Sequence, residues 1–129
     1  MARNTSKYPT ELELEILKIL WRDGQATVRE VRKKLVGFRK LAYTSVMTMM
    51  SIMTEKGYLK RAKEGNYYVY KPKISEQETT QGILSDIVER LFDGSAAAAM
   101  VNLLETGDID EDEIKQLREL IKQKGRETK

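Results

Sequence analysis

Polar residues that cap helices precede apolar residues at helical spacing in three stretches of the chain. Residues 10–13 (TELE), 27–30 (TVRE) and 75–78 (SEQE) each place a Thr or Ser three positions before a Glu. In such a capping box, each of the two side chains accepts a hydrogen bond from a backbone N–H at the helix start. We predict helices over about residues 11–22, from 28 to the glycine at 37, and from 76 to about 93.

The first two predicted helices each carry one apolar face, which is typical of helices packed on a shared core. Gly24 is predicted to end the first helix, because glycine readily adopts the left-handed backbone found at helix ends. Trp21 is interpreted as a core anchor rather than a binding platform. The residues predicted to be buried are Leu14, Leu17, Leu20, Trp21, Val28, Val31, Leu35 and Val36.

A third predicted helix, residues 42–57 (AYTSVMTMMSIMTEKG), has two contrasting faces. Its apolar residues are predicted to point inward, and its small hydroxylated residues fall on the opposite side. The first set is Val46, Met49, Met50 and Met53, and the second is Thr44, Ser45, Thr48 and Ser51. Small side chains let a helix approach a surface closely, so this helix suits a DNA major groove. An ordinary amphipathic surface helix is the alternative, and this stretch alone does not exclude it.

Two short strand-like stretches follow Gly57 and predict a hairpin. Residues 58–63 and 67–71 are expected to be strands, and the Gly-Asn pair at 65–66 suits a tight primed turn. Three short helices followed by a hairpin form a winged helix-turn-helix. The hairpin tyrosines are interpreted as half-buried strand residues rather than DNA contacts. The wing is basic, as expected of an element lying along phosphates, and its cations are Lys60, Arg61, Lys63 and Lys71.

The segment after Pro72 is predicted to be entirely helical. The segment has about 55 residues, and a single layer of helices of this size cannot bury all of its apolar surface. A second copy of the chain is therefore expected to cover that surface. The residues predicted for this dimer contact are Ile83, Ile87, Leu91, Phe92, Met100, Val101, Leu104, Ile114, Leu117 and Ile121. We therefore expect a mainly α fold with a small β-wing, with a winged helix-turn-helix DNA-binding domain at 1–74 and an all-α dimerisation region at 75–129.

The charge of the two parts agrees with this division. Residues 1–74 contain 16 Lys and Arg against 7 Asp and Glu, a net charge of +9. Residues 75–129 contain 7 against 13, a net charge of −6. A basic half joined to an acidic half indicates that the first part meets a polyanion and that the second does not.

Composition argues against an enzyme and against a metal sensor. The chain has no histidine and no cysteine, which removes the commonest general base, the commonest metal ligand and all thiolate chemistry. The methionines share or border the apolar face of the third helix and are interpreted as core residues rather than a copper site. We predict no catalytic residue, no metal and no cofactor. The sequence shows no secretory signal or membrane span, and with the missing cysteines this favours the cytoplasm.

Several separated motifs, in the same order, make the chain resemble a known family. They are Pro9-Thr10-Glu11 through Leu20-Trp21, residues 27–30 (TVRE), residues 42–48 (AYTSVMT) and residues 55–59 (EKGYL). Over about residues 7–124 the sequence resembles the penicillinase-repressor family, of the BlaI/MecI/CopY type. The resemblance implies a homodimeric winged-helix transcriptional repressor that occludes promoters at inverted repeats in double-stranded DNA, with a helical C-terminal dimerisation part.

The resemblance also implies roles for individual residues. The base-facing positions of the recognition helix match Thr44, Ser45, Met47 and Thr48. The expected backbone contacts are Tyr43, the basic connector with Arg39 and Lys40, and Lys60, Arg61 and Lys63 on the wing. The antibiotic-resistance repressors have basic residues where Thr44 and Met47 stand here. We therefore expect weaker arginine-to-guanine readout and contacts with thymine methyl groups instead.

Induction in the repressors that the chain resembles is proteolytic, through a cut after an Asn that destroys dimerisation. The matching pair here is Asn102-Leu103, and the implied partner is a membrane sensor protease. An Asn in an apolar run is also typical of an ordinary helix-surface residue, so both readings stay open. The copper-responsive branch of the family uses C-terminal cysteines, which this chain lacks.

Two functions compete at this point. A dimeric repressor that reads DNA explains the split charge and the order of helices and hairpin. A protein-interaction adaptor that keeps the fold without reading DNA explains the missing Arg and Lys on the reading face and the acidic C-terminal half. Steep salt dependence of DNA binding is expected of the repressor alone, because neutralised phosphates release counterions.

Overall fold

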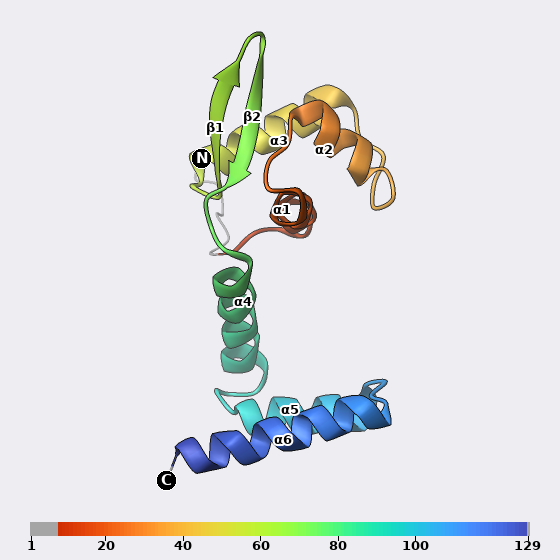
Figure 1. Ribbon diagram of the computed structural model, residues 1–129, viewed down its shortest axis with the longest axis vertical. Helices are drawn as coiled ribbons and strands as arrows, with labels where there is room; N and C mark the ends of the chain where they lie inside the picture. The colour runs from red at the N-terminus through yellow and green to blue at the C-terminus, as the bar shows by residue number, and fades with distance from the viewer. Residues whose placement is uncertain (1–7, 129) are drawn as a thin grey trace. The chain divides into compact units, whose positions relative to one another are not determined.

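The computed structural model describes residues 8–128, and its elements follow the predicted order (Figure 1). Contacts divide the chain into a first unit, residues 1–84, and a second unit, residues 85–129. Residues 1–7 of the first predicted domain and residue 129 of the second lie outside the described range. The elements are α1 (Glu11–Asp23), α2 (Val28–Leu35), α3 (Tyr43–Glu55), β1 (Leu59–Glu64), β2 (Tyr67–Pro72), α4 (Glu76–Leu91), α5 (Ala96–Thr106) and α6 (Glu111–Glu127).

Capping boxes start α1 and α2, as predicted. At α1 the hydroxyl of Thr10 accepts the backbone N–H of Glu13 at 3.2 Å, and the carboxylate of Glu13 accepts that of Thr10 at 2.8 Å. Thr27 and Glu30 make the same pair of bonds at α2. The hydroxyl of Ser75 accepts a backbone N–H three residues on at 3.1 Å, and the described residues show no return bond there. Two of the three predicted boxes are therefore complete.

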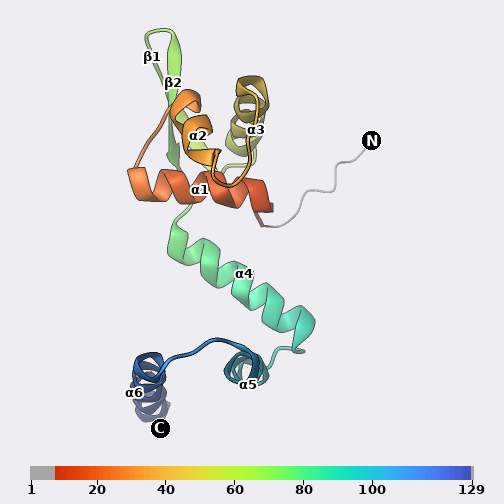
Figure 2. The same ribbon diagram turned by 90° about the vertical axis from the view of Figure 1, so that its right-hand side faces the viewer.

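The core of the first unit forms where α1, α2 and α3 meet the base of the hairpin, and Figure 2 shows these three helices gathered together. The helices contribute aliphatic and methionine side chains, and the hairpin contributes one leucine and one tyrosine. The fully buried large side chains are Ile16, Leu17, Leu20, Val31, Leu35, Val46, Met50, Met53, Leu59 and Tyr70, together with the carboxylate residue Glu13. Burial of this apolar surface is the main force that stabilises the unit.

The predicted buried faces of α1 and α2 need correction. Ile16 and Ile19 are buried although neither was assigned to the core, and Leu14 is only half-buried. The prediction for Val36 was wrong, since its side chain is 55% exposed. The helix α2 ends at Leu35, so residue 36 lies in the following turn and no longer follows the helical face.

Trp21 anchors α1 to the segment that leads into α4. Its ring is half-buried against the core, and its indole N–H donates to the carbonyl of Ile74 at 2.9 Å. The prediction that Trp21 is a core anchor is confirmed. Thr79 in the first turns of α4 is buried as well, which explains why contacts group these turns with the first unit. The functional division after residue 74 stays a prediction.

The hairpin is an antiparallel pair with a two-residue turn. Its register places Arg61 opposite Tyr70, Lys63 opposite Tyr68, and Lys60 opposite a second lysine. Gly65 in the turn has a φ of 60°, and Asn66 is not among the described residues with positive φ. This is the pattern of a type II′ turn, whose twist matches that of the strands, so the predicted primed turn is confirmed.

The helices of the second unit bury little of their apolar surface in a single chain. No residue of α5 or α6 is buried. The helix α6 begins with a complete capping box between Asp110 and Glu113, and its first turn is acidic, which suits the positive end of the helix dipole. None of the described helices has the length and apolar character needed to cross a membrane.

Candidate nucleic-acid interface

The helix α3 separates a buried side from an exposed side, as its sequence pattern predicts. The buried residues are Val46, Met50 and Met53, with Met49 half-buried against the core. The exposed residues include every predicted base-facing position, Thr44, Ser45, Met47 and Thr48. Tyr43 opens the helix and is 44% exposed. The helix has no charged residue before Glu55, so its exposed side offers hydroxyl and methyl groups rather than cations.

The connector between α2 and α3 is held in place from α2. Arg32 donates its Nε hydrogen to the carbonyl of Leu41 at 2.9 Å, one residue before the N-cap of α3. This bond ties α2 to the residue that precedes the N-cap of α3. Lys34 forms an ion pair with Asp23, which holds the pKa of that carboxyl below its ordinary value. Arg32 and Lys34 therefore both have partners within the first unit, although their side chains are exposed.

The predicted connector contacts remain available for a ligand. Arg39 and Lys40 are both exposed, and neither forms an ion pair within residues 8–128. The guanidinium of Arg39 lies 5.6 Å from the ring centroid of Phe38, whose side chain is itself 38% exposed. Two free cations therefore lie immediately before the exposed side of α3.

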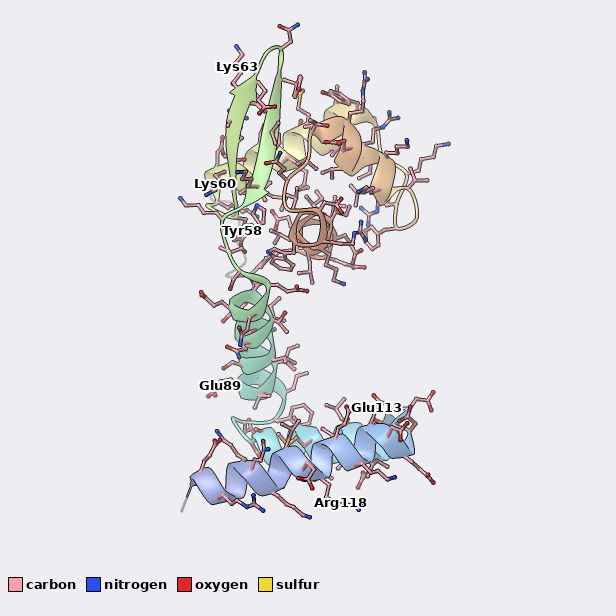
Figure 3. All side chains as sticks on the ribbon, viewed as in Figure 1. Tyr58, Lys60, Lys63, Glu89, Glu113 and Arg118 are labelled. Carbon is pink, nitrogen blue, oxygen red and sulfur yellow. The ribbon has the colours of Figure 1, made fainter. Side chains whose placement is uncertain are left out.

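The wing cations lie on two different faces of the hairpin. Side chains alternate along a strand, so Arg61 and Lys63 share one face and Lys60 lies on the other. Figure 3 shows Lys63 close to the tip of the wing and Lys60 closer to its base, near Tyr58. Lys60 lies directly opposite Lys71 across the strands, an arrangement of like charges that is unfavourable unless an anion or solvent screens it.

A groove of about 900 Å³ separates α3 from the wing. It brings together four of the predicted contact residues, Tyr43, Met47, Thr48 and Arg61. Thr44, Ser45, Arg39, Lys40, Lys60 and Lys63 do not line it. The predicted site is thus distributed over a groove and its surroundings, with the unpaired connector and wing cations outside the groove.

Sequence analysis placed Ser51 on the hydroxylated face of α3, but it did not include Ser51 or several other groove residues among the expected DNA contacts. Ser51 and Glu55 continue the line of Tyr43 and Met47 along α3 at intervals of four residues, which is the spacing of one helix face. That spacing was a usable signal. Tyr67 and Tyr68 line the groove from the wing and are 52% and 39% exposed. The interpretation of the tyrosines as half-buried strand residues is wrong for Tyr67 and Tyr68, which are exposed. Tyr70 is more buried than predicted, since its side chain is fully buried.

The formal charges of the side chains that line the groove are balanced. Arg29 and Arg61 contribute two cations, and Glu30 and Glu55 contribute two carboxylates. The carboxylate of Glu30 accepts the backbone N–H of Thr27 at 2.9 Å, so it serves the helix cap. Glu55 makes no ion pair within the described part of the chain. The negative charge of Glu55 therefore acts on a ligand in the groove without being neutralised by an ion pair.

The predicted dimer residues lie on α4, α5 and α6, except Phe92, which directly follows α4, and none is buried in the single chain. Leu91, Met100 and Ile121 are 72%, 56% and 62% exposed. The pair Asn102-Leu103 lies inside α5, where the carbonyl of Asn102 accepts the hydroxyl of Thr106 at 2.7 Å. The described residues contain no group of three carboxylates that could hold a metal ion.

Comparison with known proteins gives a consistent result. A model of the penicillinase repressor family matches residues 9–123. The penicillinase repressor of Bacillus licheniformis is 26% identical over 114 residues, which cover 88% of this chain and 89% of that protein. The transcriptional regulator BlaI of Mycobacterium tuberculosis is 32% identical over 103 residues, which cover 78% of this chain and 75% of that protein.

A solved structure extends the likeness to the fold. A mutant MarR from E. coli, in complex with operator DNA, has a TM-score of 0.51 and 15% identity, and the match covers 89% of this chain and 74% of that one. At this identity the likeness concerns the fold alone. The relatives in the matched family are transcriptional repressors, which are not enzymes. Because the family match spans nearly the whole length, the chain belongs to the penicillinase repressor family.

Proposed function

We propose that this chain is a sequence-specific DNA-binding repressor that acts as a homodimer on an inverted-repeat operator. The observation that carries the proposal is the exposed, uncharged side of α3 with unpaired cations of the connector before it and of the wing beside it. Cations position a protein on phosphates, and a helix with small side chains reads base edges. The base-facing residues in this proposal are Thr44, Ser45, Met47 and Thr48.

Dimerisation is supported by the exposed apolar residues of the second unit. A single chain leaves leucine, isoleucine and methionine side chains of α4, α5 and α6 more than a third exposed, which is unusual for a stable monomer. A two-fold contact through these helices would cover them. It would also set two α3 helices at one spacing, matching half-sites about one helical turn or a multiple apart.

Derepression by cleavage between Asn102 and Leu103 is the finer part of the proposal. The protease would be a membrane sensor, and the repressor itself would act in the cytoplasm without a cofactor. Proteases bind extended chain, so α5 must open locally before cleavage. Opening costs little in the single chain, where α5 has no buried residue, and costs more in the proposed dimer, where a second copy covers Met100, Val101 and Leu104. Replacement of Asn102 by Gln should leave DNA binding intact and block release in cells that express the protease.

Salt dependence of binding tests the central proposal. Genomic fragments selected by the purified full chain should share an inverted repeat, and the affinity for them should fall by orders of magnitude between about 50 and 200 mM salt. Equal affinity at both salt concentrations would contradict phosphate-driven binding. If no DNA is retained while a protein partner is captured stoichiometrically, the adaptor function is the correct one.

A further inference from the structure

The guanidinium of Arg61 is held by two tyrosines of the neighbouring strand. Its Cζ atom lies 4.2 Å from the ring centroid of Tyr68, which is the geometry of a cation–π contact. Its Nη1 donates a long hydrogen bond of 3.5 Å to the hydroxyl oxygen of Tyr70. The two rings meet edge to face, with centroids 6.4 Å apart and planes at 62°. One of the wing cations therefore has a defined position before any ligand arrives.

The strand register creates this arrangement. Arg61 lies directly opposite Tyr70, and Tyr68 is the diagonal neighbour on the same face. Tyr70 is 1% exposed, so the core fixes its ring and hence its hydroxyl. The hydrogen bond that Arg61 donates to Tyr70 raises the pKa of Arg61 above its ordinary value, and the Glu55 carboxylate of the same groove adds to the effect. Arg61 nevertheless remains exposed and lines the groove, so its free edge can meet a ligand.

The other wing cations lack such support. Lys60 and Lys63 make no ion pair and no ring contact within residues 8–128, and both are exposed. A free lysine or arginine loses rotamer freedom when it binds a phosphate, and that loss weakens binding. The contacts with Tyr68 and Tyr70 already restrict the rotamers of Arg61 in the folded protein. A planar guanidinium also matches phosphate oxygens in pairs, which an ammonium does not.

We propose that Tyr68 and Tyr70 are positioning residues that hold Arg61 ready to bind a DNA phosphate in the groove between α3 and the wing. The inference rests on the proposed DNA-binding function and deepens it. If α3 lies in the major groove of a DNA duplex, the phosphodiester strand at the edge of the major groove lies next to the protein groove. The wing forms one wall of that protein groove. Arg61 would then be the wing contact with the least ordering cost, and Tyr68 would act through it without touching DNA.

The test distinguishes the phosphate contact of Arg61 from the positioning of Arg61 by Tyr68. Binding of the full chain to a mixed-sequence DNA duplex is measured between about 50 and 200 mM salt for the unchanged protein and for Arg61→Ala, Tyr68→Leu, Tyr68→Phe and Arg61→Ala/Tyr68→Leu. Arg61→Ala should lower the slope of log affinity against log salt by about 0.9, the value for one lost phosphate contact. Tyr68→Leu should keep the slope and weaken binding about two- to five-fold. Tyr68→Phe should bind like the unchanged chain, because the ring face remains.

The double variant shows whether Tyr68 acts on DNA binding through Arg61. If Tyr68 acts through Arg61, Tyr68→Leu should cause no further loss in the Arg61→Ala background. Equal losses in both backgrounds, or no loss from Tyr68→Leu, would overturn the inference. Thermal unfolding of each variant controls for folding, and Tyr68 is exposed enough for its replacement to be tolerated. If the unchanged chain binds no duplex at any salt concentration, the proposed function itself fails and this inference falls with it.

Discussion

The carboxylate of Glu13, buried at the start of α1, accepts a hydrogen bond of 2.8 Å from the ammonium of Lys56 at the C-cap of α3. Its other oxygen completes the capping box with Thr10. Lys56 also lies 5.8 Å from the ring centroid of Tyr58, and its charge suits the negative end of the α3 dipole. One glutamate therefore caps the first helix and holds the last turn of the helix that faces the groove.

Breaking this pair should destabilise the first unit. Lys56→Met leaves a carboxylate that is 1% exposed without its cation, and the expected cost is about 3 kcal/mol. The chain has one tryptophan, Trp21, which packs against the same core, so urea unfolding followed by its fluorescence reports on this unit. The matched control is Lys18→Met, which breaks the exposed ion pair with Glu15 and should cost less than about 1 kcal/mol. Equal costs would show that the Glu13–Lys56 pair has no special role.

Stability should fall in strong alkali through Tyr58. Burial, and secondarily the charge of Glu13, raises the pKa of the Tyr58 hydroxyl above its ordinary value of 10.0. The folded state then holds this proton more tightly than the unfolded state. The contribution is fully present below pH 10 and is lost as the pH rises above 10 through the raised pKa. Tyr58→Phe should make the urea midpoint fall less steeply between about pH 9 and 11, and an unchanged pH profile would contradict the shift.

Neutralising Glu55 should strengthen DNA binding. Its carboxylate lines the groove and has no ion-pair partner among residues 8–128, so it repels a phosphodiester strand there. Glu55→Gln should tighten binding to a mixed-sequence duplex about two- to five-fold at low salt. Glu127→Gln, at the end of α6, changes the net charge by the same amount far along the chain and serves as the control. The same gain from both variants would mean that only total charge matters.

Base contacts and phosphate contacts should separate by mutation. Thr48→Ala removes a methyl and a hydroxyl from the exposed side of α3, so discrimination between selected and scrambled sequences should fall by about 1 kcal/mol. Lys60→Ala should weaken binding to both sequences alike and lower the salt slope by about 0.9. Both quantities come from fluorescence anisotropy titrations at several salt concentrations. A uniform loss from Thr48→Ala would place that residue on the phosphates instead.

A charge on the apolar face of α6 should dissociate the proposed dimer. Ile121 is 62% exposed in the single chain, and burying an aspartate against a second copy would leave its charge unpaired. Ile121→Asp should therefore sediment as a monomer at concentrations where the unchanged chain is dimeric. Gln123→Asp, two residues further and on the opposite side of the helix, should stay dimeric. If Ile121→Asp is still dimeric, α6 does not form part of the dimer interface.

The features that the sequence predicted correctly depend on short-range interactions. The capping boxes at Thr10 and Thr27, the inward methionines of α3 and the two-residue turn at Gly65 each involve residues within a few positions of one another. Helical spacing likewise separated the buried from the exposed side of α3. Local patterns of this kind determine the order and type of the elements, and with them the winged-helix fold.

Only the tertiary structure decided which polar groups are shared between distant elements. Glu13 reaches Lys56 across 43 positions, and Trp21 reaches Ile74 across 53, and neither pairing leaves a periodic trace in the sequence. The groove joins residues of α2, α3 and the wing, so its balanced formal charge was not visible in the strongly basic total of residues 1–74. Side-chain partners of this sort depend on how the elements pack in three dimensions, and packing is decided by contacts between residues that lie far apart in the sequence.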